Sequence, residues 1–289
     1  MSALHVLEAG PLTLVQDLGR PGHAAIGVSP SGALDRASLR LANRLVGNAE
    51  GAAAFEIAVG GFAARFDGVA WVAVTGAWGS VEVDGRSLAP DVATPVAAGS
   101  ELRFGVARRG LRYYLAVRGG LEVPTVLGSR SRDTLSGLGP DPAAVGDVFA
   151  IGSAPTGGIP LVDAMTIGPP DDGVATIGLT PGPRADWVST ATLERLFDQP
   201  WTISTQSNRV GARLDGRPLE RLDRGELPSE GMVAGSVQLS PSGLPTVLLA
   251  DHPVTGGYPV IAVVADASLD VFGQLRPGQQ LRFRHARPL

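Results

Sequence analysis

The sequence contains no cysteine and no lysine, so all 24 basic residues are arginine. Without cysteine there are no disulfides, thiolate nucleophiles or cysteine metal ligands. Without lysine the chain by itself can form neither a Schiff base nor a Walker A phosphate loop. The four histidines are scattered and show no HxH or HExxH spacing, so we expect no metal site. They are His5, His23, His252 and His285.

Charge and long apolar runs are also limited. The net charge of −4 provides no basic footprint for nucleic acid. No apolar run approaches the length of about 18 residues that crosses a bilayer. The first residues lack the basic segment followed by an apolar one that marks a secretion signal. We therefore expect a cytoplasmic protein that binds neither nucleic acid nor membrane.

What the chain has in quantity is glycine and proline, with 39 and 23 among 289 residues. This composition favours many short strands joined by tight turns over long helices. The sequence therefore predicts a mainly β fold with a few short helices. The clearest helix is expected over residues 33–46, with Ser31 as its N-cap.

The two halves of the chain share a local order. A predicted helix and strand precede ARFDG at 64–68 in the first half and ARLDG at 212–216 in the second. GSELRF at 99–104 is matched by GQQLRF at 278–283. A duplication explains this order, although Asp-Gly hairpins also recur by chance. We predict two similar β-rich domains, 1–155 and 156–289, with a linker within 151–170.

The stretch DHPVTGGYP, residues 251–259, lies between two apolar runs that read as buried strands. Gly256 and Gly257 allow positive φ, and their amides could face an anion or oxyanion. Asp251 and Tyr258 could supply an acceptor and a donor at the rim. The alternative is an ordinary hairpin loop in which the two glycines only make the turn.

Two further polar segments are candidates for ligand binding. In the first, Gln16, Asp17 and Arg20 could face a ligand, and Arg20 offers a planar fork for carboxylate or phosphate. In the second, Arg130 and Ser131 belong to a loop dense in arginine and hydroxyl groups, which suits anions. The alternatives are a turn held by Asp17 and a mobile surface loop.

Several stretches resemble one family, the carboxyltransferase-like proteins known as allophanate hydrolase subunit 2, as the Kip anti-inhibitor and as the C subunit of bacterial 5-oxoprolinase. The same module occurs in urea carboxylase. The resemblance covers essentially the whole chain. The stretches that carry it are Val15–Gly22, Ser31–Arg36, Leu41–Asn43, Val46–Asn48, Leu127–Ser131, Gln206–Arg209, Ser229–Gly231 and Thr255–Pro259.

The resemblance implies two tandem cyclophilin-like β-barrel domains and a smaller companion protein, called subunit 1, the B subunit or the Kip inhibitor. Two positions depart from the family pattern. Asn208 stands where the family often has aspartate, and Val260 follows Tyr-Pro where it often has lysine. If either side chain contacts substrate in relatives, the substrate of this chain differs.

The resemblance favours the C subunit of an ATP-dependent 5-oxoprolinase, a hydrolase that opens a lactam. Because the chain lacks a Walker A motif, ATP would bind a partner, and no covalent cofactor is expected here. Asp251 or Glu230 could be the general base and Tyr258 a further catalytic group. The expected substrate-binding residues are Gln16, Asp17, Arg20, Ser31, Arg130, Ser131, Gln206, Asn208, Arg209, Thr255, Gly256 and Gly257.

Two alternatives remain open. The chain could be the carboxyltransferase half of a biotin-dependent enzyme that acts on urea or a similar amide, with biotin on a partner. It could instead be a non-enzymatic antagonist of a Kip-inhibitor-like protein, which would need only an interface.

Overall fold

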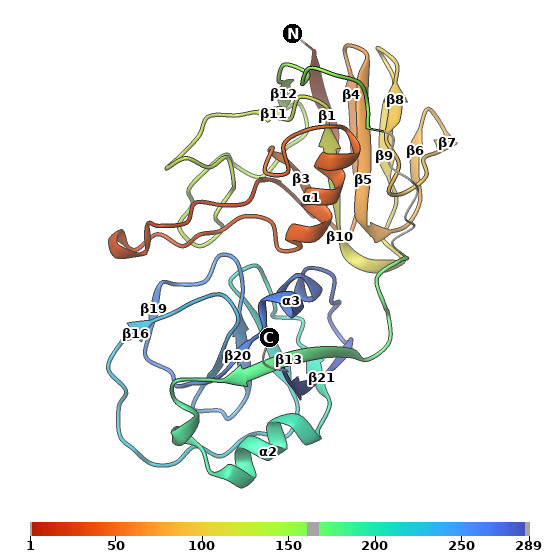
Figure 1. Cartoon of the computed structure of the whole chain (residues 1–289). Coiled ribbons are helices and arrows are strands. Elements are labelled where there is room, and N and C mark those ends of the chain that lie inside the picture. The colour runs from red at the N-terminus through yellow and green to blue at the C-terminus, as the bar shows by residue number, and fades with distance from the viewer. Residues whose placement is uncertain (1, 161–167, 287–289) are drawn as a thin grey trace. The chain divides into compact units, whose positions relative to one another are not determined.

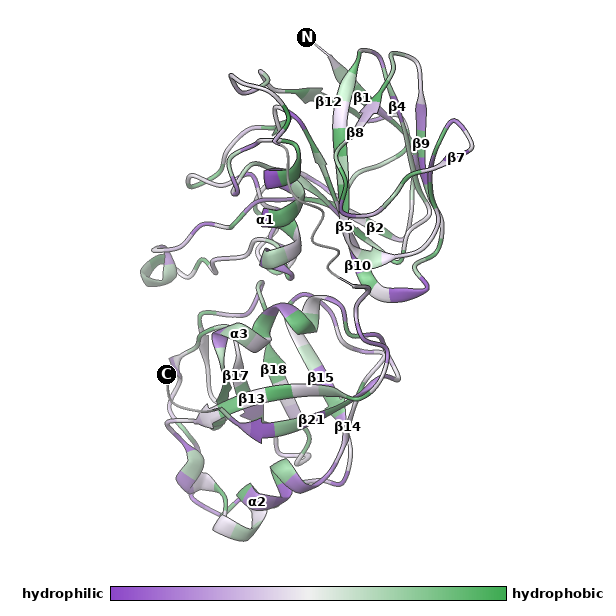
Figure 2. Cartoon of the chain, turned by 45° about the vertical axis from the view of Figure 1, so that its right-hand side comes forward, coloured by the Kyte–Doolittle hydropathy of each residue, from purple (hydrophilic) through white to green (hydrophobic). Residues whose placement is uncertain are grey.

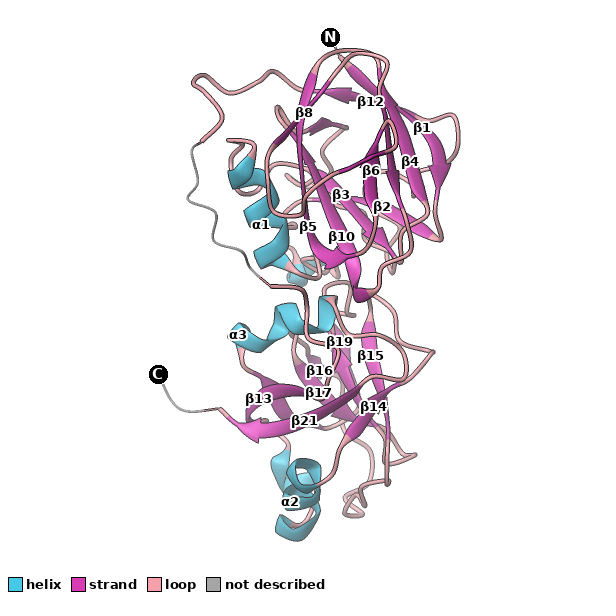
Figure 3. Cartoon of the chain, turned by 90° about the vertical axis from the view of Figure 1, so that its right-hand side faces the viewer, coloured by secondary structure: helices cyan, strands magenta, loops and turns pink. Residues whose placement is uncertain are grey.

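The computed structural model describes residues 2–160 and 168–286. The chain divides into two compact units. The first unit contains the described residues of Met1–Arg20, Asp35–Asp133 and Gly137–Pro170. The second contains Pro21–Leu34, Thr134–Ser136 and the described residues of Asp171–Leu289. Strands dominate both units and the helices are few and short, which confirms the predicted mainly β fold (Figures 1 and 3).

The first unit is built from two antiparallel sheets. The larger has the order β11-β12-β1-β4-β9-β6-β7, and the smaller has the order β2-β3-β10-β5-β8. The larger sheet consists of β1 (Ala3–Ala9), β4 (Phe62–Phe66), β6 (Val81–Val83), β7 (Arg86–Ser87), β9 (Glu101–Phe104), β11 (Leu121–Glu122) and β12 (Val148–Ile151). The smaller consists of β2 (Leu12–Gln16), β3 (Ala54–Ala58), β5 (Ala70–Trp78), β8 (Thr94–Val96) and β10 (Arg109–Val117).

The core of this unit is rich in aromatic side chains contributed by both sheets. Phe55 of β3 packs edge to face on Phe149 of β12, with the ring centroids 4.9 Å apart. Phe104 of β9 does the same with Tyr113 of β10 at 5.3 Å. Such tilted contacts add to the hydrophobic gain of burying large rings. Each contact joins a strand of the larger sheet to a strand of the smaller one.

Helix α1 (Arg36–Leu45) packs on β5 and β10 of the smaller sheet (Figure 3). Its N-cap is Asp35, whose carboxylate accepts a hydrogen bond from the Ser38 amide at 2.9 Å. The prediction that Ser31 caps this helix was therefore wrong. Both residue types are good caps, but Ser31 has a positive φ of 53° and its hydroxyl is engaged elsewhere.

The second unit is a closed barrel of seven strands in the order β13-β20-β17-β18-β15-β14-β21. Hydrophobic residues run along β13 and β18, while the end of β21 is hydrophilic (Figure 2). The barrel strands are β13 (Ala175–Pro181), β14 (Trp201–Ile203), β15 (Gly211–Asp215), β17 (Ser236–Leu239), β18 (Pro245–Leu248), β20 (Val260–Val264) and β21 (Gln280–His285).

The shorter elements of the second unit lie outside this barrel order. Two two-residue strands pair with each other, β16 (Glu230–Gly231) and β19 (Thr255–Gly256). Helix α2 packs against β21. The helical elements are η1 (Ala24–Ile26), η2 (Ala185–Trp187), α2 (Thr190–Asp198), α3 (Asp266–Leu269) and η3 (Asp270–Gly273).

The strands on either side of the 251–259 stretch are present as predicted, but they do not form a hairpin. β18 and β20 both pair with β17, which lies between them in the barrel. The connection instead contributes β19 and crosses from one neighbour of β17 to the other. The hairpin alternative for this stretch is therefore excluded by the topology.

The division into units differs from the predicted boundary at 155. The first unit extends to residue 170, and segments 21–34 and 134–136 group with the second. Of the predicted linker, residues 161–167 lie outside the described residues. The predicted duplication is reflected in element order, because α1 precedes β3 and β4 while α2 precedes β14 and β15. The pairing differs, since β9 pairs with β4, whereas β21 pairs with β14 and β13.

Candidate functional site

The predicted site residues separate into three groups. One is a polar cluster in the first unit, containing the buried Gln16, Asp17, Arg20 and Ser131 and the half-buried Arg130. The second is a buried ion pair with its surroundings in the second unit, containing Ser31, Arg209 and Asp251. The third is a set of exposed or half-buried residues of the second unit, namely Gln206, Asn208, Glu230, Thr255, Gly256, Gly257 and Tyr258.

Asp251 lies at the centre of the second group and is completely buried. Arg209 forms a bidentate pair with it, with Nε 2.9 Å from Oδ2 and Nη2 3.0 Å from Oδ1. The Ser31 hydroxyl donates to Oδ1 at 2.7 Å. The Thr134 amide and hydroxyl donate to Oδ2 at 2.9 and 2.7 Å. The carboxylate therefore accepts five hydrogen bonds.

These contacts decide the charge of Asp251. Burial alone would raise the pKa of this carboxyl group, but the Arg209 charge and the hydrogen bonds from Arg209, Ser31 and Thr134 outweigh it and leave the pKa below its usual value. The group is ionised, enclosed and saturated with donors. Such a carboxylate is better suited to hold segments 21–34 and 134–136 on the barrel than to take a proton from a substrate. A catalytic role for Asp251 stays a prediction.

Asp17 is the centre of the buried cluster in the first unit. Its Oδ1 accepts from the hydroxyls of Ser129 and Ser131 at 2.6 and 2.5 Å, and from the Gly19 amide at 2.7 Å. Its Oδ2 accepts from the Arg130 amide at 2.6 Å. The Ser131 hydroxyl accepts from the Asp17 amide in return. The carboxylate thereby fixes the 129–131 loop against the end of β2.

The side chains around this cluster are engaged with backbone carbonyls. Arg20 donates to the carbonyls of Ser131 and Val126, and Arg130 donates to that of Val123. The Gln16 amide donates to the Arg132 carbonyl at 2.9 Å. The structure thus brings all five predicted residues of this unit together. It gives the two arginines loop-holding contacts rather than an open anion fork.

Glu230 is the accessible carboxylate among the candidates, with a side chain 26% exposed. Arg184 lies against it in a two-pronged ion pair, and this pair lowers the pKa of Glu230 through the hydrogen bonds and charge of Arg184. Strand pairing sets Glu230 of β16 opposite Gly256 of β19. Tyr258 follows two residues later and is 48% exposed. Glu230 and Arg184 are therefore partly accessible to solvent, and Tyr258 is exposed.

The two glycines of this segment differ from the prediction, because neither has a positive φ. Gly256 instead lies close to the ends of two flexible side chains. A Cβ there would lie 2.8 Å from Nε2 of Gln238 and 3.2 Å from Cε of Met232. The two glycines therefore do not form a turn with positive φ, and Gly256 is a residue of strand β19. An oxyanion role for the two amides stays a prediction.

The remaining predicted residues lie in the loop between β14 and β15. Asn208 is exposed, and its Oδ1 accepts from the amides of Val210 and Gly211 at 2.9 and 3.2 Å. This is a turn-forming contact of a kind that asparagine favours. Gln206 is exposed in the same loop. The turn carries Arg209, whose side chain is buried, to Asp251.

Three residues matter to these arrangements but were not predicted as site residues. Thr134 and Arg184 complete the environments of Asp251 and Glu230, yet they lie 117 and 46 residues away in the sequence. Only Ser129 could have been found, because it stands two residues before Ser131 in the same hydroxyl-rich loop. Within residues 2–160 and 168–286, no group of three or more metal-binding side chains was found.

Comparison with known proteins places the chain in a family. The family model for the carboxyltransferase domain, subdomain A and B, matches residues 26–285. The chain is 37% identical to the C subunit of 5-oxoprolinase from Escherichia coli, over 97% of this chain and 90% of that protein. It is 33% identical to urea amidolyase of Lachancea kluyveri, over 97% of this chain and 17% of that protein.

Solved structures of related proteins have the same fold as this chain. Urea carboxylase of Kluyveromyces lactis has a TM-score of 0.92 at 31% identity, covering 99% of this chain and 27% of that one. TTHA0988 has a TM-score of 0.89 at 35% identity, covering 98% of this chain. The chain spans about half (55%) of TTHA0988. None of the helices in the described residues is long and apolar enough to cross a membrane. The chain belongs to the carboxyltransferase domain family, subdomain A and B.

Proposed function

We propose that this chain is the C subunit of an ATP-dependent 5-oxoprolinase and works with a smaller partner subunit. The observation that carries the proposal is the 37% identity to the E. coli C subunit, which extends over 90% of that protein. The 5-oxoprolinase C subunit of Haemophilus influenzae is also 33% identical over 97% of this chain.

The proposed reaction has two parts, activation of the lactam by ATP and attack by water, which we assign to different proteins. A lactam is an unactivated amide, and phosphorylation of its oxygen by ATP makes its carbonyl carbon open to water. The sequence holds no lysine for a Walker A loop, so ATP is assigned to a partner. This chain is left with binding the 5-oxoproline carboxylate and with helping water to attack.

The accessible groups of the second unit are the proposed contacts with substrate. Arg184 holds Glu230 ionised through their two-pronged ion pair, so that Glu230 can accept a proton from water, and the positive charge of Arg184 attracts the substrate carboxylate to this place. Tyr258 supplies an exposed hydroxyl donor. The surrounding loops are held by two buried clusters. One is Asp251 with Arg209 and Ser31, and the other is Asp17 with Ser131.

The test begins with the tagged chain purified together with its native partners. ATP-dependent release of glutamate from 5-oxoproline is then measured for the wild type and for Glu230→Gln. A loss of about a hundredfold or more in kcat with unchanged complex assembly is expected for a general base. Glu226→Gln, an exposed change in the same segment, is the matched control and should keep full activity. Full activity in Glu230→Gln would remove this carboxylate from the mechanism.

A carboxyltransferase role is the second candidate, and the TM-score of 0.92 to K. lactis urea carboxylase favours it. Under this function the partner would carry biotin, and the complex would transfer a carboxyl group to urea or a similar amide. Mass spectrometry of the purified complex separates the two. A biotinylated partner would favour the carboxyltransferase, and its absence together with ATP-dependent glutamate release would favour the oxoprolinase. Partner binding without either activity would indicate the antagonist role.

A further inference from the structure

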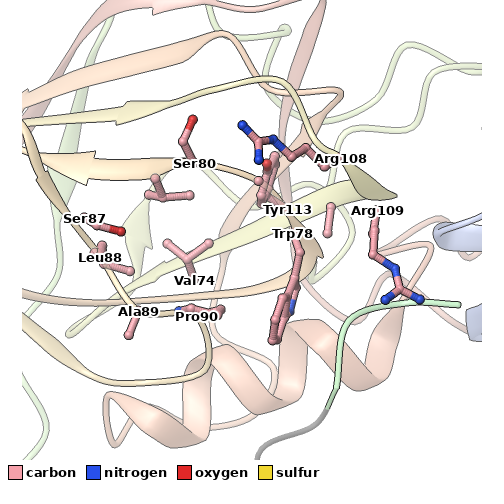
Figure 4. A pocket seen from close by; sticks show the side chains of 13 residues that line it. Val74, Trp78, Ser80, Ser87, Leu88, Ala89, Pro90, Arg108, Arg109 and Tyr113 are labelled. Carbon is pink, nitrogen blue, oxygen red and sulfur yellow. The ribbon is translucent and has the colours of Figure 1, made fainter. Parts of the chain in front are cut away.

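A cavity of about 440 Å³ lies within the first unit, and its lining residues include none of those predicted for the site. It is bounded by β5, β6, β7 and β10 and by the segments that join or follow them (Figure 4). Its volume is in the range of pockets that hold small organic ligands.

The cavity has an apolar floor and a polar rim. The floor is made by buried side chains, among them Val74, Leu88 and the ring of Tyr113. The Tyr113 hydroxyl donates to the Gly105 carbonyl at 3.4 Å, so the ring contributes chiefly its apolar surface. Exposed Ser80 and Ser87 stand at the rim.

Two arginines, Arg108 and Arg109, border the cavity and bring positive charge to its rim. In Figure 4 the guanidinium of Arg108 lies on the Ser80 side of Trp78, and that of Arg109 lies on the opposite side. Trp78 between them is half-buried and offers a flat apolar wall. Arg108 is the exposed one of the two arginines.

We propose that this cavity is a separate ligand site that takes a small carboxylic acid with an apolar body. The apolar part would lie against Val74, Leu88 and Trp78, where it leaves water. The carboxylate would remain at the rim and accept hydrogen bonds from Arg108, which is a charge-assisted contact. The site is independent of the proposed oxoprolinase chemistry, because it shares no residue with the exposed group around Glu230.

The test uses 4-phenylbutyrate as the probe and its uncharged analogue 4-phenyl-1-butanol as the comparison. Titration of the full chain, followed by calorimetry and by tryptophan fluorescence, should show saturable binding of the acid at one site. The alcohol should bind about tenfold more weakly, because it lacks the charge that Arg108 recognises. Arg108→Gln should weaken the acid by about the same factor and leave the alcohol unchanged.

Two further variants make the result specific to this cavity. Arg86→Gln removes an exposed arginine of the neighbouring β7 that does not line the cavity, and it should leave binding of the acid unchanged. Ser87→Trp places a bulky group at the exposed rim and should abolish binding, while thermal unfolding confirms an intact fold. The proposal is overturned if the acid does not saturate at millimolar concentration, if acid and alcohol bind equally, or if Ser87→Trp binds as the wild type does.

Discussion

Asp17 and Asp251 are both buried carboxylates that hold loops, but different kinds of groups stabilise them in the two units. Asp17 in the first unit accepts from two serine hydroxyls and two backbone amides. Asp251 in the second unit is bound by the guanidinium of Arg209 as well as by Ser31 and Thr134. The first arrangement divides the charge among several dipoles, whereas the second sets one full charge against another.

This difference predicts different responses to loss of a single partner. A buried ion pair is strongly destabilised when one member is removed, because the other charge stays uncompensated in a medium of low polarity. A carboxylate held by several dipoles loses only one contribution at a time. The predictions below test this contrast, from the largest expected effect to the smallest.

Arg209→Met should lower the free energy of unfolding of the second unit by about 3–5 kcal/mol, because Asp251 is left buried and unpaired. Urea denaturation followed by tryptophan fluorescence measures the change. Arg213→Met removes an exposed arginine from β15 and should change stability by less than about 0.5 kcal/mol. If the two changes lower the free energy of unfolding equally, the buried ion pair contributes no more to stability than an exposed arginine.

Acid should act on the same pair. The folded-state pKa of Asp251 lies below its usual value of 3.8, so its stabilising contribution is present above that value and is lost as the pH falls through the folded pKa. We expect the second unit to lose stability in the window below about pH 4. In Asp251→Asn the stability at neutral pH should be lower and its dependence on acid weaker. If Asp251→Asn loses stability below pH 4 as the wild type does, Asp251 is not the group responsible.

Ser131→Ala should cost about 1–3 kcal/mol, because it removes one donor to the buried Asp17 carboxylate and the acceptor of the Asp17 amide. The expected effect on the first unit is thus smaller than that of Arg209→Met on the second. Thermal unfolding gives the comparison, with the exposed Thr125→Ala as the matched change. A loss as large as that of Arg209→Met would remove the contrast between the two arrangements.

Asp91 is a half-buried carboxyl group of the first unit, and burial raises its pKa to about 6. A raised folded-state pKa means that the associated stability is fully present below the unfolded value of 3.8 and is lost as the pH rises through about 6. Asp91→Asn should therefore stabilise the chain at pH 8 by about 1 kcal/mol, after allowance for screening by water. The gain should vanish near pH 4. A gain that is equal at both pH values would show that ionisation is not its cause.

The parts of the fold that follow local rules were predicted well. The strands around 246–250 and 260–265 are present as β18 and β20, because short runs of branched residues between turn formers favour buried strands. The helix was placed within a few residues, but its cap was assigned to Ser31 instead of Asp35.

The candidate site was predicted in part. Asp17, Arg20, Arg130 and Ser131 lie together as a cluster, but their contacts are with each other and with the backbone. The sequence shows that polar residues gather in a loop and does not show whether they face a ligand or one another. Arg184 was missed because nothing near it in the sequence indicates that it would meet Glu230, 46 residues away.

By itself, the sequence determined the mainly β class, the absence of cysteine and lysine chemistry, and the position of the two strands beside residues 251–259, because these depend on composition and on spacing over a few residues. The tertiary structure decided which segments belong to which unit. Ser31 lies 220 residues from Asp251, yet the hydrogen bond between them joins segment 21–34 to the barrel. A buried carboxylate needs donors, and only the folded chain shows which residues supply them.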